Sequence, residues 1–225
     1  TLLSPLLFLG LLSPLTSAQG LPTADDGAPL VECFSGEPGT QAPGSLTTHF
    51  NGGNGFAGNT FDITPTIDME ITGLDFHARG TNVYDIDVYY KIDTCVGYEQ
   101  TASAWTLLGS ATGITGNGGG VGSFADLSGN GVVFSAGQKY GIYMDNSNYA
   151  SAGGVSYTNG ATTPETYSNA DLTLEAYSGT RSPAFTGGAP FTPRIWNGTL
   201  YYDGGAGSIS LSSTGSAGGA MTFDV

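Results

Sequence analysis

Apolar and polar residues alternate with a period of two through much of residues 67–202, and this pattern constrains the fold more than any other feature. In the first run, Ile67, Met69 and Ile71 are separated by the acidic side chains of Asp68 and Glu70 and followed by Thr72. The same alternation recurs in residues 84–90, 105–107, 140–144, 171–176 and 195–202. Successive side chains of a strand point to opposite faces of a sheet, so each run predicts a β-strand with one apolar face.

The connections between these runs are rich in glycine, for example in residues 116–120 and 128–131. After Gly73 the apolar phase moves to Leu74 and Phe76, which predicts a β-bulge at the glycine. Outside the N-terminal leader, no long stretch has the 3.6-residue period of an amphipathic helix. We therefore predict an all-β fold. It is an antiparallel β-sandwich of about eight strands, of jelly-roll type, with flexible N- and C-terminal segments.

The two ends of the chain differ from this strand-rich body. Residues 1–18 are uncharged, contain an apolar run too short to span a bilayer and end in small residues. These features predict a truncated signal peptide cleaved before Gln19, with a buried strand or helix as the alternative. Residues 19–45 predict a leader or linker, and residues 204–225 a Gly/Ser-rich tail or linker. The sandwich domain is predicted over residues 46–203, in a protein that is secreted or held at the cell surface.

The charge balance excludes several classes of partner. The chain has 5 Lys and Arg residues against 19 Asp and Glu residues, which gives a formal net charge of −14. Nucleic acids and anionic membranes bind proteins through clusters of basic residues, so neither is expected as a partner. No membrane insertion is expected after removal of the signal peptide. Hydrophobic residues make up 39% of the chain, enough to bury a core of ordinary size, so disorder throughout is excluded.

The chain has two cysteines and two histidines, which excludes zinc-finger and multi-disulfide frameworks. An oxidising compartment would permit a disulfide bond between Cys33 and Cys95, the one pair available. Such a bond would tie the leader to the sandwich and stabilise the fold by roughly 3–4 kcal/mol. The alternative is two separate thiols. His49 and His77 lie in no recognisable catalytic motif, and we interpret them as strand residues.

Six phrases of the body are similar, in their order and spacing, to one known module. They are NGGNGFAGNTFDI (51–63), VYYK (88–91), CVGYEQTASAWTLLGSA (95–111), SAGQKYGIY (135–143), SYTNG (156–160) and FTPRIWNGTLYY (191–202). Over residues 46–203 the chain resembles an uncharacterised β-sandwich module that recurs in secreted and surface-attached bacterial multidomain proteins. The resemblance implies export, a sandwich fold and neighbouring adhesion or sorting modules, and it implies no catalytic residues. Cys33 precedes the module, so the resemblance does not imply the disulfide bond.

Paired carboxylates are the strongest argument for catalysis. No G-x-S-x-G, H-E-x-x-H or P-loop motif occurs in the sequence. Asp85 and Asp87 lie two residues apart in a predicted strand, as do Asp68 and Glu70, at a spacing of about 6–7 Å that suits a glycosidase. Both pairs lie on the polar face, however, where solvent keeps a carboxyl at its ordinary acidity. We therefore interpret them as solvated strand faces and expect no enzyme activity.

Asp145, Asn146 and Asn148 lie close together after a predicted strand. Carboxylate and carbonyl oxygens are the ligands that calcium prefers, so these residues are a candidate calcium site. The alternative is an Asx-rich turn after the strand. No other cofactor is indicated.

Aromatic residues supply the candidate ligand-binding residues. Tyr89 and Tyr90, like Tyr201 and Tyr202, are adjacent in predicted strands, so one ring of each pair points away from the core. Exposed Tyr and Trp rings stack on sugars and are common at protein contacts. The candidates are Trp196, Tyr201, Tyr202 and Tyr89. The alternatives are that both sheet faces are covered, or that Tyr simply suits strands.

Together these features predict a secreted or cell-surface, non-catalytic binding or adhesion module, with an extracellular glycan or protein as its partner. One alternative is a structural spacer or subunit that self-assembles through a paired or donated edge strand. Another is a carbohydrate-active hydrolase, which requires two carboxylates in a concave cleft. The fold class does not choose among the three functions.

Overall fold

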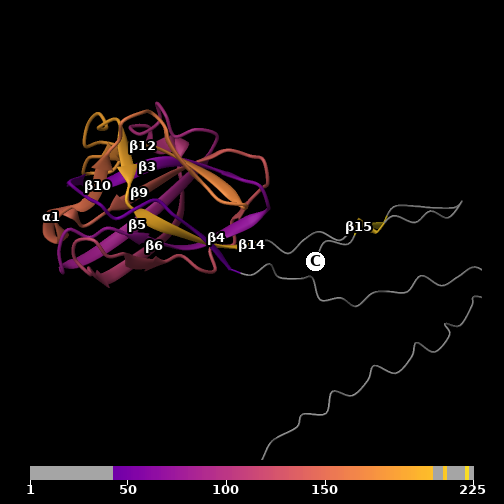
Figure 1. Ribbon diagram of the computed structural model, residues 1–225, viewed down its shortest axis with the longest axis horizontal. Helices are drawn as coiled ribbons and strands as arrows, with labels where there is room; N and C mark the ends of the chain where they lie inside the picture. Colours follow the sequence, from indigo (N-terminus) through magenta and orange to yellow (C-terminus); the bar gives the residue numbers. More distant parts are fainter. Residues whose placement is uncertain (1–42, 205–209, 212–220, 223–225) are drawn as a thin grey trace, which may run out of the picture. The chain divides into compact units, whose positions relative to one another are not determined.

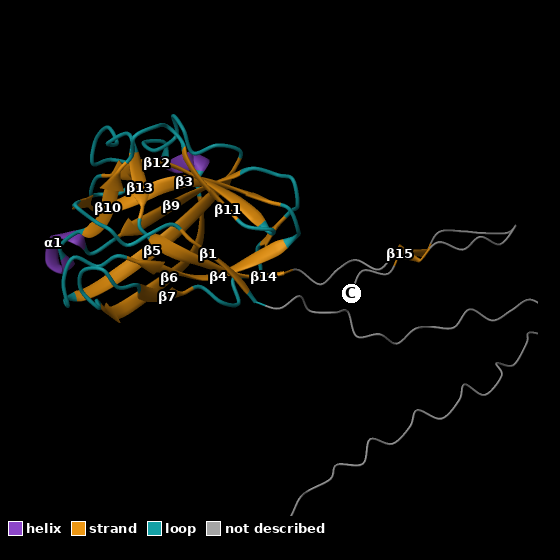
Figure 2. Cartoon of the chain, in the orientation of Figure 1, coloured by secondary structure: helices purple, strands orange, loops and turns teal. Residues whose placement is uncertain are grey.

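A computed structural model describes residues 43–204, 210–211 and 221–222 of the chain. Residues 44–204 form an all-β sandwich of antiparallel strands, as the alternation predicts (Figures 1 and 2). The jelly-roll type stays a prediction. The predicted signal peptide, nearly all of the leader and most of the tail lie outside the described residues.

The sandwich is built from two large sheets. The five-stranded sheet has the order β1 (Gly44–Thr47), β14 (Gly198–Gly204), β4 (Met69–Phe76) and β7 (Ser123–Asp126), and β8 (Val133–Phe134) also pairs with β4. The six-stranded sheet has the order β11 (Glu165–Ser168), β12 (Leu172–Thr180), β3 (Gly58–Pro65), β9 (Tyr140–Asn146), β5 (Val83–Ile92) and β6 (Thr106–Thr115). All strand pairings in these two sheets are antiparallel.

A small third sheet and two short helices complete the domain. The third sheet has the order β13 (Arg194–Trp196), β10 (Val155–Asn159) and β2 (Asn54–Phe56). The helices are a 3-10 turn at Ala102–Ala104 and α1 at Tyr149–Ala152. In the tail, β15 (Ser210–Leu211) pairs with β16 (Met221–Thr222). Within the described residues, no helix has the length and apolar character needed to cross a membrane.

The core lies between the two large sheets. Phe61 of β3 and Ile142 of β9 contribute to it from the six-stranded sheet, and Leu74 and Phe76 contribute from β4 of the other sheet. All four side chains are completely buried. Burying a side chain of this size stabilises a fold by about 1.5–3 kcal/mol. The alternation in the sequence therefore marks the residues that hold the two sheets together.

The bulge that the sequence predicts at Gly73 is present. Tyr201 of β14 pairs with Gly73 and Tyr202 pairs with Ile71, so Thr72 is the extra residue of β4. A Cβ at Gly73 would lie 2.7 Å from the ring of Phe124, and this close approach requires glycine. The extra residue shifts the phase of β4, so the apolar residues on both sides of it face the core.

A second apolar cluster covers part of the outer face of the six-stranded sheet. Its buried members are Cys95, Trp105 and Tyr143, and Tyr89 and Phe185 pack against them. The covering residues come from the segment between β5 and β6 and from the segment between β12 and β13. Both faces of this sheet are therefore covered at this point. This agrees with the alternative to ligand binding given above for the aromatic residues, namely that both sheet faces are covered.

The three-stranded sheet lies far from the points where the chain enters and leaves the domain. In Figures 1 and 2, β10 and α1 are at one end of the domain, and the C-terminal end of β14 is at the other. Gly44 pairs with Tyr202, so the chain enters and leaves the domain at neighbouring positions. The surface around β10 is therefore remote from the points where the leader and the tail attach.

Candidate functional site

The three arginines of the chain lie together around β10, although they are far apart in the sequence. Arg79 follows β4, Arg181 follows β12 and Arg194 begins β13. Burial raises the pKa of Tyr157, and a hydrogen bond with Arg194 and the charges of all three guanidinium groups oppose this rise. We call the set Arg79, Arg181, Arg194, Phe56 and Phe191 the arginine surface; the ring of Tyr157 lies buried beside it.

Aromatic rings position two of the three charges. The Cζ atom of Arg181 lies 4.0 Å from the centroid of the Phe191 ring. The Cζ atom of Arg194 lies 5.8 Å from the ring centroids of both Phe191 and Tyr157. Phe56 packs edge-on against Phe191, with 5.8 Å between the ring centroids. The negative face of an aromatic ring attracts a cation, so these contacts restrain the guanidinium groups without neutralising them.

Glycines make room for the third arginine. A Cβ at Gly55 would lie 3.2 Å from Cδ of Arg79, and a Cβ at Gly154 would lie 3.1 Å from the same atom. The side chain of Arg79 therefore lies across β2 and the start of β10. The backbone N–H of Arg79 donates a hydrogen bond to the Gly154 carbonyl at 3.2 Å. Arg79 itself is exposed, whereas Arg181 and Arg194 are half-buried.

Some of the guanidinium donors are used within the domain. Nε of Arg181 donates to the Ala189 carbonyl at 2.8 Å, and Nη1 of Arg194 donates to the Pro193 carbonyl at 2.7 Å. Nε of Arg194 is buried without a hydrogen-bond partner. A guanidinium group carries five N–H donors. Arg194 also forms a hydrogen bond with the Tyr157 hydroxyl. Several donors of Arg79 and Arg181 therefore have no partner among the described residues, whereas those of Arg194 are largely used or buried.

Carboxylates do not neutralise this surface. Across the described parts of the chain, ion pairs within 4.0 Å involve Lys139 alone, which contacts Asp62 and Glu175. Acidic residues outnumber basic residues 19 to 5 in the chain, so a group of three arginines without a carboxylate partner is unusual. Like charges placed together repel one another, and a bound anion would remove this cost. The arrangement is suited to binding a negatively charged group.

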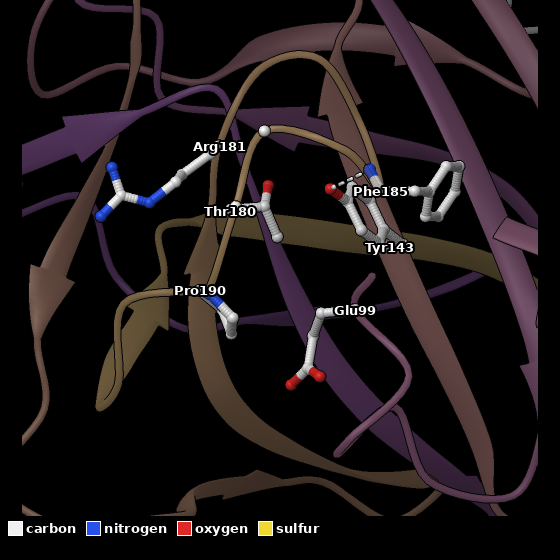
Figure 3. Close-up of a pocket in the computed structure, with 8 residues that line it drawn as sticks. Glu99, Tyr143, Thr180, Arg181, Phe185 and Pro190 are labelled. Carbon is white, nitrogen blue, oxygen red and sulfur yellow. Dashed lines mark hydrogen bonds between the residues drawn. The ribbon is translucent and has the colours of Figure 1, made fainter. Parts of the chain in front are cut away.

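A small hollow lies beside the arginine surface, against the outer face of the six-stranded sheet (Figure 3). It encloses about 180 Å³, including the solvent at its mouth, and is lined by Glu99, Tyr143, Thr180, Arg181, Phe185, Gly187, Gly188 and Pro190. Burial raises the pKa of Tyr143 to about 12, and the Tyr143 hydroxyl accepts a hydrogen bond from the Phe185 N–H at 3.4 Å. In Figure 3 the side chain of Arg181 extends away from Glu99 and Tyr143. Its guanidinium group is therefore directed to Phe191 rather than into the hollow.

Two of the four aromatic residues predicted to bind a ligand belong to the core. Trp196 and Tyr202 are each 1% exposed. Trp196 stacks on Phe61 with 4.6 Å between the ring centroids, and the Tyr202 hydroxyl donates to Asp171 at 2.9 Å. This burial corrects the expectation that Trp196 and Tyr202 face a ligand. Their strands are covered on the side to which these rings point.

The other two candidates, Tyr201 and Tyr89, are half-buried and lie on different sheets. The Tyr201 hydroxyl donates to Asp75 at 2.8 Å, and Phe124 packs against the ring edge-on at 5.5 Å. Tyr89 packs edge-on against Phe185 at 5.1 Å, within the outer cluster. The structure therefore does not bring the four predicted aromatic residues together into one site.

The predicted calcium ligands do not converge either. Asp145 and Asn146 are consecutive residues of β9, so their side chains point to opposite faces of the sheet. Nδ2 of Asn146 donates to the Gly153 carbonyl at 2.6 Å. Asn148 accepts from the Asp85 N–H at 3.0 Å and donates to the Val83 carbonyl at 3.2 Å. The structure therefore does not bring these three side chains together, and the two amides tie the chain after β9 to neighbouring backbone. Calcium binding stays a prediction.

The paired carboxylates are used to hold neighbouring segments. Asp85 accepts from the Gly113 N–H at 2.8 Å, and Asp87 accepts from the Ser110 hydroxyl at 2.5 Å. On the other sheet, Asp68 accepts from the Ala136 N–H at 2.7 Å and Glu70 accepts from the Gly131 N–H at 3.1 Å. A backbone or hydroxyl donor satisfies one oxygen of each carboxylate. Among the residues that the structure describes, no group of three or more His, Cys, Asp or Glu side chains could hold a metal ion.

The histidines and Cys95 are embedded in the fold. Nε2 of His77 accepts from the Gly120 N–H at 2.6 Å, and burial lowers the pKa of both His77 and His49. Cys95 is completely buried and forms no disulfide bond within the described residues, and burial, followed by the neighbouring charge of Asp62, raises the pKa of its thiol. Cys33 lies outside the described residues, so the Cys33–Cys95 disulfide bond stays a prediction.

Reasoning from the sequence missed the arginine surface. The scarcity of basic residues could have indicated this surface. A chain with a net charge of −14 has five Lys and Arg residues, so each one is a candidate for a specific role. Arg194 also lies inside the aromatic phrase FTPRIWNGTLYY. No model of a known protein family matches the chain, and no curated protein matches its sequence.

Proposed function

We propose that this chain is a secreted or cell-surface, non-catalytic module that binds carbohydrate through the arginine surface. The observation that carries the proposal is the convergence of three arginines and the rings of Phe56 and Phe191 on one exposed end of the sandwich. Aromatic rings contact the apolar faces of sugars, and guanidinium groups donate to their oxygens. The apolar residues 1–18 support export.

The chemistry of these groups favours binding over catalysis. Guanidinium groups stay charged at any physiological pH, and burial raises the pKa of Tyr157. None of these groups exchanges a proton near neutral pH, as a general acid or base must. They can hold a ligand by charge, hydrogen bonds and ring contact.

The position of the arginine surface also supports a binding role. It lies at the end of the domain remote from the N-terminal end of β1 and the C-terminal end of β14 (Figures 1 and 2). A module tethered through its leader or tail would therefore present this surface to its surroundings. The net charge of −14 argues against nucleic acid and anionic membranes as the partner.

A glycan-array screen of residues 19–225, run with and without calcium, tests the proposal. We expect binding of a defined set of glycans, and a loss of about tenfold in affinity in the Phe191→Ala variant, which removes the ring beneath Arg181. The matched control is Phe124→Ala, which removes a half-exposed ring from the five-stranded sheet. The control should bind as the natural chain does. The proposal fails if no glycan is bound, or if both variants bind normally.

A self-assembling structural subunit is the second candidate, and β6 favours it. This strand of ten residues lies at the edge of the six-stranded sheet, contains no charged residue and exposes Leu107 by 50%. Unprotected edge strands pair readily with other chains. Self-association through β6 is compatible with binding at the arginine surface, because the two features belong to different sheets.

A further inference from the structure

We infer that the ligand of the arginine surface is a short glycan bearing a negatively charged oxyanion, either a carboxylate or a sulfate ester, which is held by Arg181 and Arg194 against Phe191. This inference rests on the proposed function and specifies the chemistry of the ligand.

The first argument is the local charge. Three positive charges surround Tyr157, and no carboxylate of the described residues lies within 4.0 Å of any of them. A neutral sugar would leave their mutual repulsion in place, whereas one anionic group would remove much of it. The two glycines beneath Arg79 leave space for a third cation at the same surface. An anionic ligand therefore fits this surface better than a neutral one.

The second argument is hydrogen-bond geometry. Arg181 and Arg194 both lie over Phe191, with their Cζ atoms 4.0 and 5.8 Å from its centroid. One donor of each is bound to a backbone carbonyl, which restrains the plane of the guanidinium group. The remaining donors of Arg181 form a planar fork that matches two oxygens of one group, as in a carboxylate or a sulfate. This fork, with the second guanidinium charge of Arg194 beside the same ring, selects an oxyanion more strongly than a hydroxyl group.

The third argument concerns the length of the ligand. The whole chain carries a net charge of −14, so a long polyanion would be repelled by the rest of the surface. Charges beyond about 8 Å are largely screened at physiological ionic strength, so a single acidic sugar responds mainly to the nearby arginines. The half-buried rings of Phe56 and Phe191 offer apolar contact to a sugar beside the charge. A short acidic oligosaccharide satisfies both conditions.

Calorimetric titration of the mature chain with matched trisaccharides tests the inference. The arms are trigalacturonate, its neutral methyl ester, a sulfated galactotriose and unsulfated galactotriose. We expect one acidic sugar to bind at least about tenfold more tightly than its neutral counterpart. The two acidic arms distinguish a carboxylate from a sulfate ester.

Two substitutions of Arg181 separate the contribution of its charge to binding from that of its planar hydrogen-bonding group. Arg181→Gln should weaken binding of the preferred acidic sugar by about tenfold, and Arg181→Lys, which keeps the charge but loses the planar fork, should recover only part of it. The control is Gln138→Glu, which changes the net charge by the same amount in the exposed turn before β9. It should change the affinity by less than about twofold, because that charge is distant and screened. Thermal unfolding of each variant verifies that the fold is retained.

The outcomes distinguish this inference from the proposed function. If neutral and acidic sugars bind equally, the inference is overturned while the carbohydrate-binding function stands. If trigalacturonate and a tri-aspartate peptide bind equally well, the surface recognises a carboxylate without recognising a sugar, and the inference is likewise overturned. If the glycan array and all four trisaccharides show no binding, the proposed function fails together with it.

Discussion

Asp145 is a carboxylic acid that the fold has removed from water. Its side chain is 4% exposed, its Oδ1 atom is buried without a hydrogen-bond partner, and Asp87 lies directly opposite on β5. Burial, and secondly the charge of Asp87, raise the pKa of Asp145 to about 7. Around neutral pH the folded chain therefore retains a proton that the unfolded chain has already lost.

This proton gives a prediction for stability. Because the pKa of Asp145 is higher in the folded state, its contribution to stability is present below about pH 4 and is lost as pH rises to about 7. The Asp145→Asn variant has no proton to lose. We expect it to exceed the natural chain in free energy of unfolding by roughly 1–3 kcal/mol at pH 8 and to match it at pH 4.

Urea unfolding at a series of pH values between 4 and 8 measures this difference. Asp87→Asn is the control, since it removes the neighbouring charge but leaves Asp145 buried, and it should flatten the pH dependence only in part. Parallel pH profiles for Asp145→Asn and the natural chain would contradict the prediction.

At the scale of elements, β6 is an edge strand of the six-stranded sheet, and its unpaired side could pair with another chain. It pairs with β5 on one side only, and its pairing contains two register shifts. Bulges bend an edge strand and limit its pairing with other chains, but β6 has no charged residue to reinforce this effect. The strand is therefore only partly protected.

We expect the mature chain to form dimers as its concentration rises, through pairing of β6 with β6 of a second copy. Leu107→Lys places a charge on the exposed part of this strand and should shift the equilibrium to the monomer by about tenfold or more. Analytical ultracentrifugation over a hundredfold range of concentration measures the shift. Val133→Lys, at an exposed apolar position of β8, is the matched control and should leave the dimer unchanged. A chain that stays monomeric throughout would exclude self-assembly through β6.

At the scale of the whole molecule, the two ends of the chain decide how the domain is used. The described strands of the sandwich lie between Gly44 and Gly204. Removal of residues 1–18 would therefore leave each of these described strands in the chain. Cys95 is completely buried, so reagents reach its thiol after denaturation.

Intact mass of the secreted product tests the N-terminal end. We expect the mature chain to begin at Gln19 and to contain a Cys33–Cys95 disulfide bond, which by chain entropy adds roughly 3–4 kcal/mol of stability. Alkylation in denaturant, before and after reduction, counts the free thiols. A retained segment Leu2–Leu12 would contradict the cleavage site. Two thiols that react without reduction would contradict the disulfide bond.

Several features of this protein follow directly from short-range patterns in the chain. The period-two alternation identifies β4, β5, β6, β9, β12 and β14 and the core residues that they carry, because the side-chain directions of a strand depend only on its own backbone. Strands with less regular alternation, such as β3 and β10, are found only in the structure. The phase change at Gly73 located the bulge in β4 for the same reason. The alternation also grouped Trp196 with Tyr202, and the structure buries both.

Alternation divides residues between two faces, but it does not indicate which face a neighbouring segment will cover. For that reason the sequence predicts Trp196 and Tyr202 as ligand-binding residues, whereas packing between the sheets places both in the core. Asp145 acquired its high pKa because the segments around the outer cluster exclude water and β5 brings Asp87 opposite. The arginine surface depends on strand order in the same way. Arg79, Arg181 and Arg194 belong to distant segments, and they meet because β2, β10 and β13 pair at one end of the sandwich.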